Sequence, residues 1–222
     1  MAGEHPPWLD GLSLLSHDLR RPLTVIRGAA TLLLEAQDQL PAASRSQILG
    51  LIDESVEAMS ELIEDLSVVS RLAAGTLEVS LQSVPVDDLV SAAVEASRRV
   101  SSGAKVAAVA APGLEVEADR ALATRALRAL LVAALQRARE PALGLQVEPE
   151  DGAVRLVVRV PAGKGGEARG EASFEALRPA GPDPGLALYM ARGAARAMGG
   201  EVAVASASGG DVLFSFTLNR RA

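Results

Sequence analysis

The hydrophobic spacing of this chain changes type once, and that change constrains the fold more than any other feature. Up to Gly75 the apolar residues recur at helical spacing, and after it they alternate in short runs typical of strands. Two long helices are predicted before the change, over about 8–37 and 44–74. We therefore expect two domains, a helical hairpin at residues 1–75 and a mixed α/β domain at residues 76–222.

The second helical stretch has a heptad pattern. Its apolar residues alternate between spacings of four and three: Ile52, Val56, Met59, Ile63 and Leu66. Two helices alone cannot cover apolar seams of this length. A second copy of the chain would complete a four-helix bundle, so we expect a homodimer. The alternative is that the second helix packs on the other domain of its own chain.

The first helical stretch contains a histidine followed, about one turn later, by a proline. Its apolar residues form a stripe that we expect to be buried: Leu12, Leu15, Leu19, Leu23, Ile26 and Leu33. His17 lies between two stripe positions, so its imidazole is expected to face solvent. Asp18 follows it, and Pro22 is expected to bend the helix. An exposed imidazole beside a carboxylate suits a nucleophile, because the acid can orient the ring and accept its proton.

Residues 16–24 read Ser-His-Asp-Leu-Arg-Arg-Pro-Leu-Thr, and this segment resembles the phosphoacceptor box of the sensor histidine kinases. The resemblance implies that His17 accepts a phosphoryl group and that Asp18 acts as the general base. It also implies that Pro22 provides the bend, and Thr24 matches a residue often found in the box. The alternative is a helix with a surface histidine and a kink.

Two arginines flank the histidine of this box. Arg20 and Arg21 are expected either to screen phosphate charge or to form part of a solvated helix face. In related kinases the residue four after the histidine is often Thr or Asn, which positions a water molecule. Arg21 occupies that position here, which disfavours a phosphatase activity.

The second domain is expected to mix strands and helices, with the helices on one face of one sheet. Strands are predicted at about 77–81, 105–110, 114–117, 143–147, 153–160, 201–206 and 212–218, and helices at about 85–99, 119–139 and 185–198. Residues 161–184 are rich in Gly, Ala and Pro and are expected to form a mobile loop.

This order of elements resembles the ATP-binding domain of the same family. The expected fold class is therefore α+β: an N-terminal antiparallel helical hairpin that forms a dimeric four-helix bundle, followed by a C-terminal α/β sandwich of the histidine-kinase ATPase type.

Three boxes hold the nucleotide in that family, and each is altered here. Both asparagine positions of the first box hold alanine, Ala129 and Ala133, and a methyl group cannot donate an oxygen to magnesium. Pro161 stands at the position of the aspartate that reads adenine. In the glycine loop, Asp183 adds a carboxylate near the triphosphate, and Ala187 limits the approach of the backbone. We therefore expect no bound nucleotide cofactor.

The packing positions of the domain are retained by contrast. The residues expected in its core are Leu127, Leu130, Leu131, Leu186, Leu188, Val202, Val204, Phe214 and Phe216. This pattern predicts a sheet domain used for shape and not for hydrolysis. A P-loop interpretation of residues 163–165 is disfavoured, because no Ser or Thr follows Lys164.

Composition narrows the function further. The formal net charge is −6 without a basic run, so no nucleic-acid partner is expected. The chain has no cysteine and only two histidines, which disfavours a metal site and fits a reducing compartment. No apolar run is long enough to span a membrane, so no membrane partner is expected and the predicted location is cytoplasmic.

The sequence thus favours a phosphorelay protein of a two-component system, phosphorylated on His17. The preferred hypothesis is a histidine phosphotransferase that exchanges phosphoryl groups with response-regulator receivers without using ATP, the receiver supplying magnesium. One alternative is a sensor histidine kinase with an atypical ATP site. Another is a pseudokinase that regulates a partner kinase or regulator.

Overall fold

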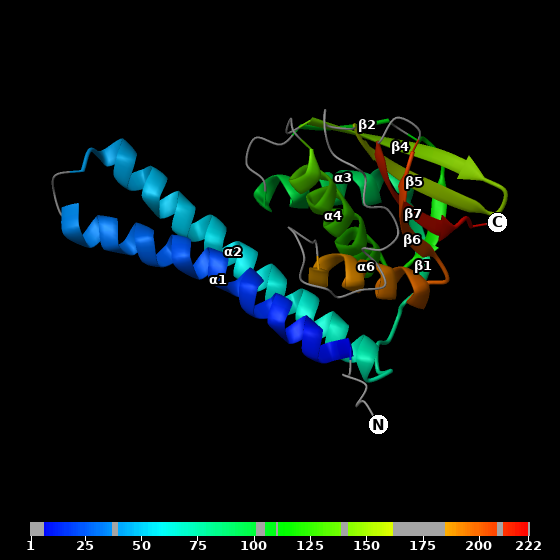
Figure 1. Ribbon diagram of the computed structural model, residues 1–222. Coiled ribbons are helices and arrows are strands. Elements are labelled where there is room, and N and C mark those ends of the chain that lie inside the picture. Colours follow the sequence, from blue (N-terminus) through cyan, green and yellow to red (C-terminus); the bar gives the residue numbers. More distant parts are fainter. Residues whose placement is uncertain are drawn as a thin grey trace, which may run out of the picture. The chain divides into compact units, whose positions relative to one another are not determined.

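The computed structural model describes residues 7–36, 40–100, 105–109, 111–138, 142–161, 185–207 and 211–221, apart from the side chains of residues 7–18, 99, 100 and 136. The chain divides into two compact units, Met1–Ser67 and Val68–Ala222. The elements of each unit are drawn in Figure 1.

The first unit is a pair of long helices that run in opposite directions (Figure 1). Helix α1 spans Pro7–Ala36, and α2 spans Ala42–Ala73, its last turns belonging to the second unit. Both helices were expected from the periodicity. Helix α1 continues on both sides of Pro22, although proline cannot donate the backbone hydrogen bond of that turn.

The apolar stripe predicted for α1 is only partly buried. Ala29 is buried, and Leu19, Ile26 and Leu33 are partly covered. Leu23 is 51% exposed, so the prediction that it is buried is wrong for the single chain. A two-helix hairpin can cover one narrow strip of each helix, because each helix has only one neighbour. The predicted burial of Leu12 and Leu15 lies outside the described side chains.

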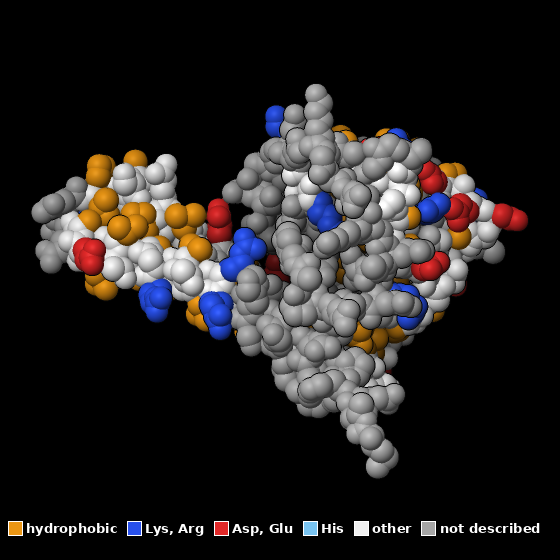
Figure 2. All heavy atoms as spheres, in the orientation of Figure 1, with side chains coloured by type: hydrophobic (Ala, Val, Ile, Leu, Met, Phe, Trp, Pro, Cys, Tyr) orange, Lys and Arg blue, Asp and Glu red, His pale blue; other side chains and the backbone are white. Residues whose placement is uncertain are grey.

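The heptad pattern of α2 separates into two rows. Ile52, Met59 and Leu66, seven residues apart, are partly buried. Val56 and Ile63 are large exposed side chains, and Leu49 extends their row by seven residues in the other direction. Figure 2 shows hydrophobic side chains gathered on the visible surface of the hairpin. The hairpin therefore carries an apolar row that its own two helices leave uncovered.

Within the described residues, the second unit contains two sheets and, besides the end of α2, three further helices. The larger sheet has the order β2-β4-β5-β7-β6, with β2 parallel to β4 and the other neighbours antiparallel. Its strands are β2 (Lys105–Ala108), β4 (Ala142–Glu150), β5 (Ala153–Val160), β6 (Glu201–Ser206) and β7 (Val212–Asn219). A separate two-stranded sheet pairs β1 (Gln82–Pro85) with β3 (Glu115–Ala118). The prediction of a single sheet is therefore wrong.

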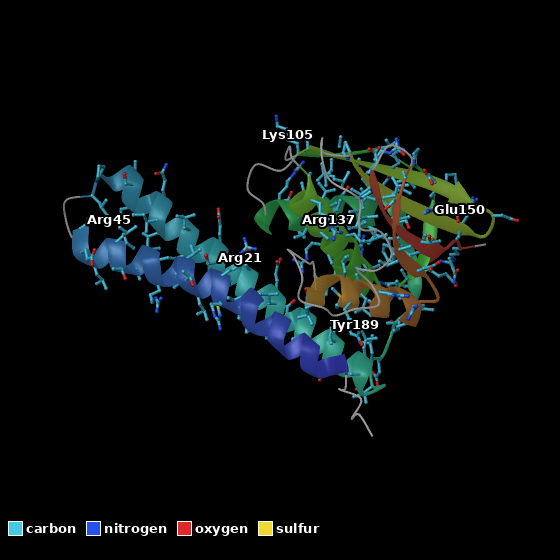
Figure 3. The ribbon with its side chains drawn as sticks, in the orientation of Figure 1. Arg21, Arg45, Lys105, Arg137, Glu150 and Tyr189 are labelled. Atoms are coloured by element: carbon cyan, nitrogen blue, oxygen red, sulfur yellow. The ribbon has the colours of Figure 1, made fainter. Side chains whose placement is uncertain are left out.

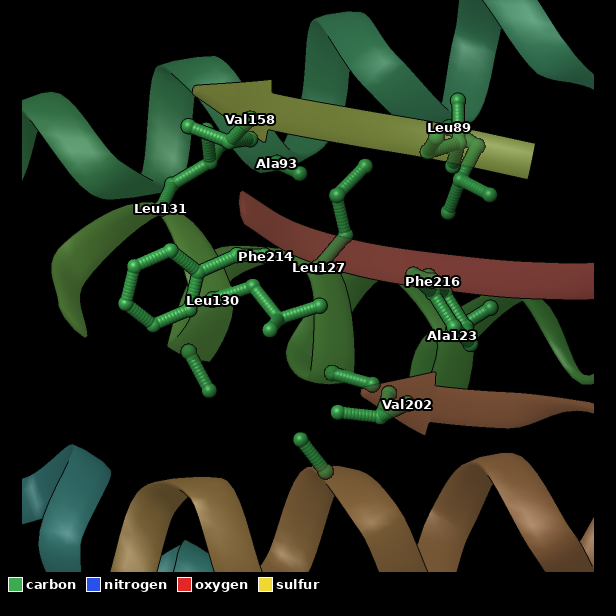
Figure 4. Close-up of a cluster of buried hydrophobic side chains, with 14 of the residues drawn as sticks. Leu89, Ala93, Ala123, Leu127, Leu130, Leu131, Val158, Val202, Phe214 and Phe216 are labelled. Atoms are coloured by element: carbon green, nitrogen blue, oxygen red, sulfur yellow. The ribbon is translucent and has the colours of Figure 1, made fainter. Parts of the chain in front are cut away.

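Helices α3 (Val86–Val100), α4 (Arg120–Arg137) and α6 (Gly185–Ala197) pack together and on the larger sheet. Alternate residues of β5 and β7 point to this layer, including Val158, Phe214 and Phe216 (Figure 4). From α4, Leu127, Leu130 and Leu131 meet them. Each core residue named from the sequence is buried, so that expectation is confirmed.

The strand predicted at 77–81 is not formed. Leu77 and Val79 alternate with exposed residues and pack on the core, which explains the pattern in the sequence. The backbone N–H of Ser80, however, donates to the Asp119 carboxylate at 3.1 Å instead of to a neighbouring strand. Pairing with β3 begins only at Gln82. Except for Pro161, the predicted mobile loop lies outside the described residues.

Candidate functional site

The segment predicted to accept a phosphoryl group, residues 16–24, lies within α1. The backbone of His17 and Asp18 is helical and continues into the turn that contains Pro22. Their side chains lie outside those described, so the predicted solvent exposure of the imidazole and its contact with the carboxylate stay predictions. Residues 17 and 21 are four apart in α1, a spacing that puts the two positions on one face of the helix.

The side chains that follow the histidine are exposed. Arg20, Arg21 and Thr24 all face solvent, and Arg21 is labelled in Figure 3. The Thr24 hydroxyl donates to the Arg20 carbonyl oxygen at 2.8 Å. This bond occupies the hydroxyl proton and adds a contact in the turn next to Pro22, where the helix lacks one backbone donor. The two guanidinium groups offer exposed positive charge within one turn of the histidine.

The first of the three altered nucleotide boxes lies on α4. Ala129 and Ala133 are each 2% exposed and belong to the hydrophobic core of the second unit. Their methyl groups provide no oxygen ligand for a hard cation. An asparagine at either position would put an amide among apolar side chains, which costs free energy unless a hydrogen-bond partner is present.

The other two boxes are only partly described. Pro161, which the sequence matched to the adenine-reading aspartate, directly follows β5 and is exposed. Ala187 lies in the first turn of α6 and is partly buried. Asp183 lies outside the described residues. The alanines matched to the first box thus lie on α4, and Ala187, matched to the glycine loop, lies on α6.

The residue that precedes α4 is the first residue of the helix predicted at about 119–139. Asp119 is the N-cap: its Oδ1 accepts hydrogen bonds from the backbone N–H groups of Ala121 and Leu122, at 3.1 and 3.2 Å. Sequence reasoning missed the close approach of Leu72 to Gly193, described below, because no local pattern signals which distant residue a glycine faces.

The described residues contain neither a candidate group of metal ligands nor a candidate membrane span. Among them, no group of three His, Cys, Asp or Glu side chains is arranged to hold a metal ion. None of their helices combines the length and apolar character that a membrane span requires.

Comparison with known proteins places these features in a family context. Residues 12–75 match the model of the His Kinase A (phospho-acceptor) domain. The chain is 28% identical over 213 residues to the sensor protein KdpD of Mycobacterium tuberculosis, covering 90% of this chain and 24% of that protein. It is 30% identical over 149 residues to the sensor histidine kinase MtrB of Mycolicibacterium paratuberculosis, covering 65% of this chain and 26% of that protein. The chain thus spans about a quarter of the length of these relatives.

Solved structures share the fold across both units. The structure of ShkA in complex with AMPPNP matches with a TM-score of 0.59 and 27% identity, covering 97% of this chain and 46% of that one. The histidine kinase ThkA in complex with the response regulator TrrA matches with a TM-score of 0.58 and 18% identity, covering 96% and 62%. A bacterial phosphotransferase matches with a TM-score of 0.52 and 19% identity, covering 96% and 98%.

Proposed function

We propose a role in phosphoryl-transfer signalling for this chain, on the premise that it belongs to the sensor histidine kinase family, whose phospho-acceptor domain its residues 12–75 match. The relatives it matches are named as a sensor protein and a sensor histidine kinase, and both are much longer than this chain. The activity of this chain is therefore inferred from its own residues.

His17 is the proposed phosphoacceptor. In the transfer, an imidazole nitrogen attacks the phosphorus of a receiver's aspartyl phosphate, an N–P bond forms, and the P–O bond to the receiver's carboxylate breaks. The ring gives up its N–H proton to Asp18 as the general base. Arg20 and Arg21 offer exposed positive charge to the phosphoryl oxygens, and the receiver brings the magnesium ion. Thr24 supports the turn that presents these groups.

The preferred form of this role is a histidine phosphotransferase that does not use ATP. The observation that carries this proposal is the burial of the Ala129 and Ala133 methyl groups in the core of the second unit. At Ala133, which matches the asparagine that holds magnesium in the family, the side chain is a methyl group packed in the core. The full-length likeness to a structure described as a bacterial phosphotransferase is compatible with this form.

The second candidate is a sensor histidine kinase that uses ATP through an atypical site, and the comparisons favour it over the first. The curated relatives are named as sensor proteins and sensor kinases, and the neighbour ShkA is described with AMPPNP bound. The third candidate is a pseudokinase that regulates a partner and makes no use of His17.

A homodimer and a response-regulator partner complete the proposal. The uncovered row of Leu49, Val56 and Ile63 repeats every seven residues, which is the spacing of a seam shared with further helices. A second copy would cover this row and form a four-helix bundle. The neighbour ThkA was solved with a response regulator, which supports a receiver as the partner of His17.

Two measurements separate the three candidates. Magnesium–ATP is titrated into the purified protein by calorimetry, and receiver domains of the same organism, labelled with radioactive acetyl phosphate, are offered to wild type and to His17→Ala. A phosphotransferase takes label from a receiver on wild type only and gives no ATP binding. Label from radioactive ATP on His17 would instead establish the kinase. Signalling unchanged by His17→Ala in cells, without label from either source, would leave the pseudokinase.

A further inference from the structure

The last turns of α2 are packed into the second unit. Val68 is 3% exposed and belongs to its hydrophobic core, and Val69 and Leu72 pack against that core. The division between the units falls between Ser67 and Val68, inside α2. The second unit, called the sheet unit below, therefore contains the end of a helix that begins in the hairpin.

This helix end comes close to Gly193 on α6 through the side chain of Leu72. A Cβ atom built on Gly193 would lie 2.5 Å from Leu72 Cδ1, 3.3 Å from Cδ2 and 3.4 Å from Cγ. Carbon atoms that are not bonded normally stay about 3.5–4.0 Å apart. The Leu72 side chain thus occupies the space that any larger residue at position 193 would fill. Glycine is a poor helix former, so its place in the interior of α6 is explained by this contact.

Helix α6 also begins where the altered glycine loop matches the chain. Gly185 is its first residue, and Ala187 lies in its first turn. Leu186, Leu188 and Met190 bury the same helix in the core. Movement of the start of α6 therefore has to break either these core contacts or the contact between Leu72 and Gly193.

We propose that Leu72 and Gly193 form a latch that keeps the sheet unit attached to the end of α2 while His17 exchanges its phosphoryl group. The inference rests on the proposed phosphotransferase function. A domain that transfers the γ-phosphoryl group of ATP to the histidine has to bring the nucleotide to the imidazole and then withdraw, which requires the domain to move. A domain that acts through its shape alone does not have to move. A fixed attachment also leaves less conformational freedom to be lost when a receiver docks, so docking costs less free energy.

The first test locks the latch covalently. The chain has no cysteine, so the double variant Leu72→Cys, Gly193→Cys contains the only two thiols. A sulfur at the place of Leu72 Cγ would lie 3.4 Å from the Cβ position at residue 193. A disulfide holds a sulfur about 3 Å from the partner's Cβ, so a small adjustment closes the bond. The single variant Leu72→Cys, treated with the same oxidant, is the control.

With the latch closed, the oxidised double variant should take label from a phosphorylated receiver at a rate within about twofold of its reduced form. A loss of about tenfold or more on oxidation, restored by dithiothreitol and absent from the single variant, would show that the sheet unit has to leave α2 and would overturn the proposal. Free thiols that persist after oxidation would overturn it as well, because residues 72 and 193 would not then be neighbours.

The second test does not depend on phosphoryl transfer. Leu72→Ala should speed amide hydrogen exchange in both residues 68–73 and α6 by about tenfold, because the latch restrains both segments. Leu81→Ala, which shortens an exposed leucine of the same unit, is the matched control and should change neither segment. Exchange in α6 that is unaffected by Leu72→Ala would contradict the latch. If no receiver labels wild type, the proposed function fails while this measurement still decides the latch.

Discussion

The methyl group of Ala133 shows how one residue can alter what a domain binds. It is buried in the core beside α4 leucines, at a position where the resemblance to kinases places a magnesium-holding amide. An apolar contact at this point stabilises the unit and offers no oxygen to a cation. Restoring the amide should therefore cost stability without restoring the site, since Ala129 and Pro161 remain altered.

Ala133→Asn is expected to lower the free energy of unfolding by about 1–3 kcal/mol, the cost of an amide without a partner in an apolar core. Urea denaturation measures the loss, and calorimetry should detect no magnesium–ATP binding by the variant. Ala121→Asn makes the same change at an exposed position of α4 and should have a much smaller effect. A gain of nucleotide binding by Ala133→Asn alone would contradict this account of the site.

Asp18→Asn removes the proposed general base and keeps the size of the side chain. Because the proton of the ring would no longer have a nearby acceptor, the initial rate of label transfer from receiver to His17 should fall by about 100-fold or more. Glu35→Gln neutralises an exposed carboxylate of the same helix and should leave the rate unchanged. A wild-type rate in Asp18→Asn would remove the base from the mechanism.

Among the elements, α4 shows how one side chain can fix the position of two segments. Asp119 caps the helix through Oδ1, and its Oδ2 accepts the backbone N–H of Ser80 at 3.1 Å. The same carboxylate thus starts α4 and holds the extended segment that leads from α2 to β1. Its second contact takes up the N–H of Ser80, which a neighbouring strand would otherwise have to bond.

Asp119→Ala is expected to lower the free energy of unfolding by about 1–2 kcal/mol, because the first turn of α4 loses its cap and Ser80 loses its acceptor. Asp119→Asn retains a side-chain oxygen and should lose less than half as much. Urea denaturation of the two variants side by side gives the comparison. Equal stability of Asp119→Ala and wild type would mean that backbone or water contacts replace the carboxylate.

On the scale of the whole molecule, the hairpin of a single chain leaves large apolar side chains exposed. Its exposed heptad row and the half-exposed Leu23 leave apolar surface that a monomer would present to water. Association of two hairpins would bury this surface, and each Val, Leu or Ile side chain so buried would contribute about 1.5–3 kcal/mol.

The double variant Val56→Glu, Ile63→Glu is therefore expected to be monomeric, while wild type sediments at twice the chain mass of 22.9 kDa. Sedimentation equilibrium across a range of concentrations measures the shift. The variant Asp53→Asn, Glu57→Gln changes two exposed acids of the same helix and should remain dimeric. A monomeric wild type at the highest concentration would rule out the bundle and require another partner for this row.

The sequence by itself determined the two long helices, the core of the sheet unit and the altered nucleotide positions. Hydrophobic periodicity is a local property of the sequence. It marks residues such as Phe214 and Leu130 as core residues without any knowledge of which elements they pack against. The residues proposed for the phosphoacceptor site, His17 and Asp18 above all, were likewise chosen from a short contiguous motif, and their roles stay predictions.

Only the tertiary structure decided which elements meet. The division of the strands into two sheets, the exposure of Leu23 and the contact of Leu72 with Gly193 each depend on residues far apart in the chain. The alternation at Leu77 and Val79 indicates only that one face is covered. Whether a backbone joins a ladder is set by the partner its N–H finds, and for Ser80 that partner is the carboxylate of Asp119.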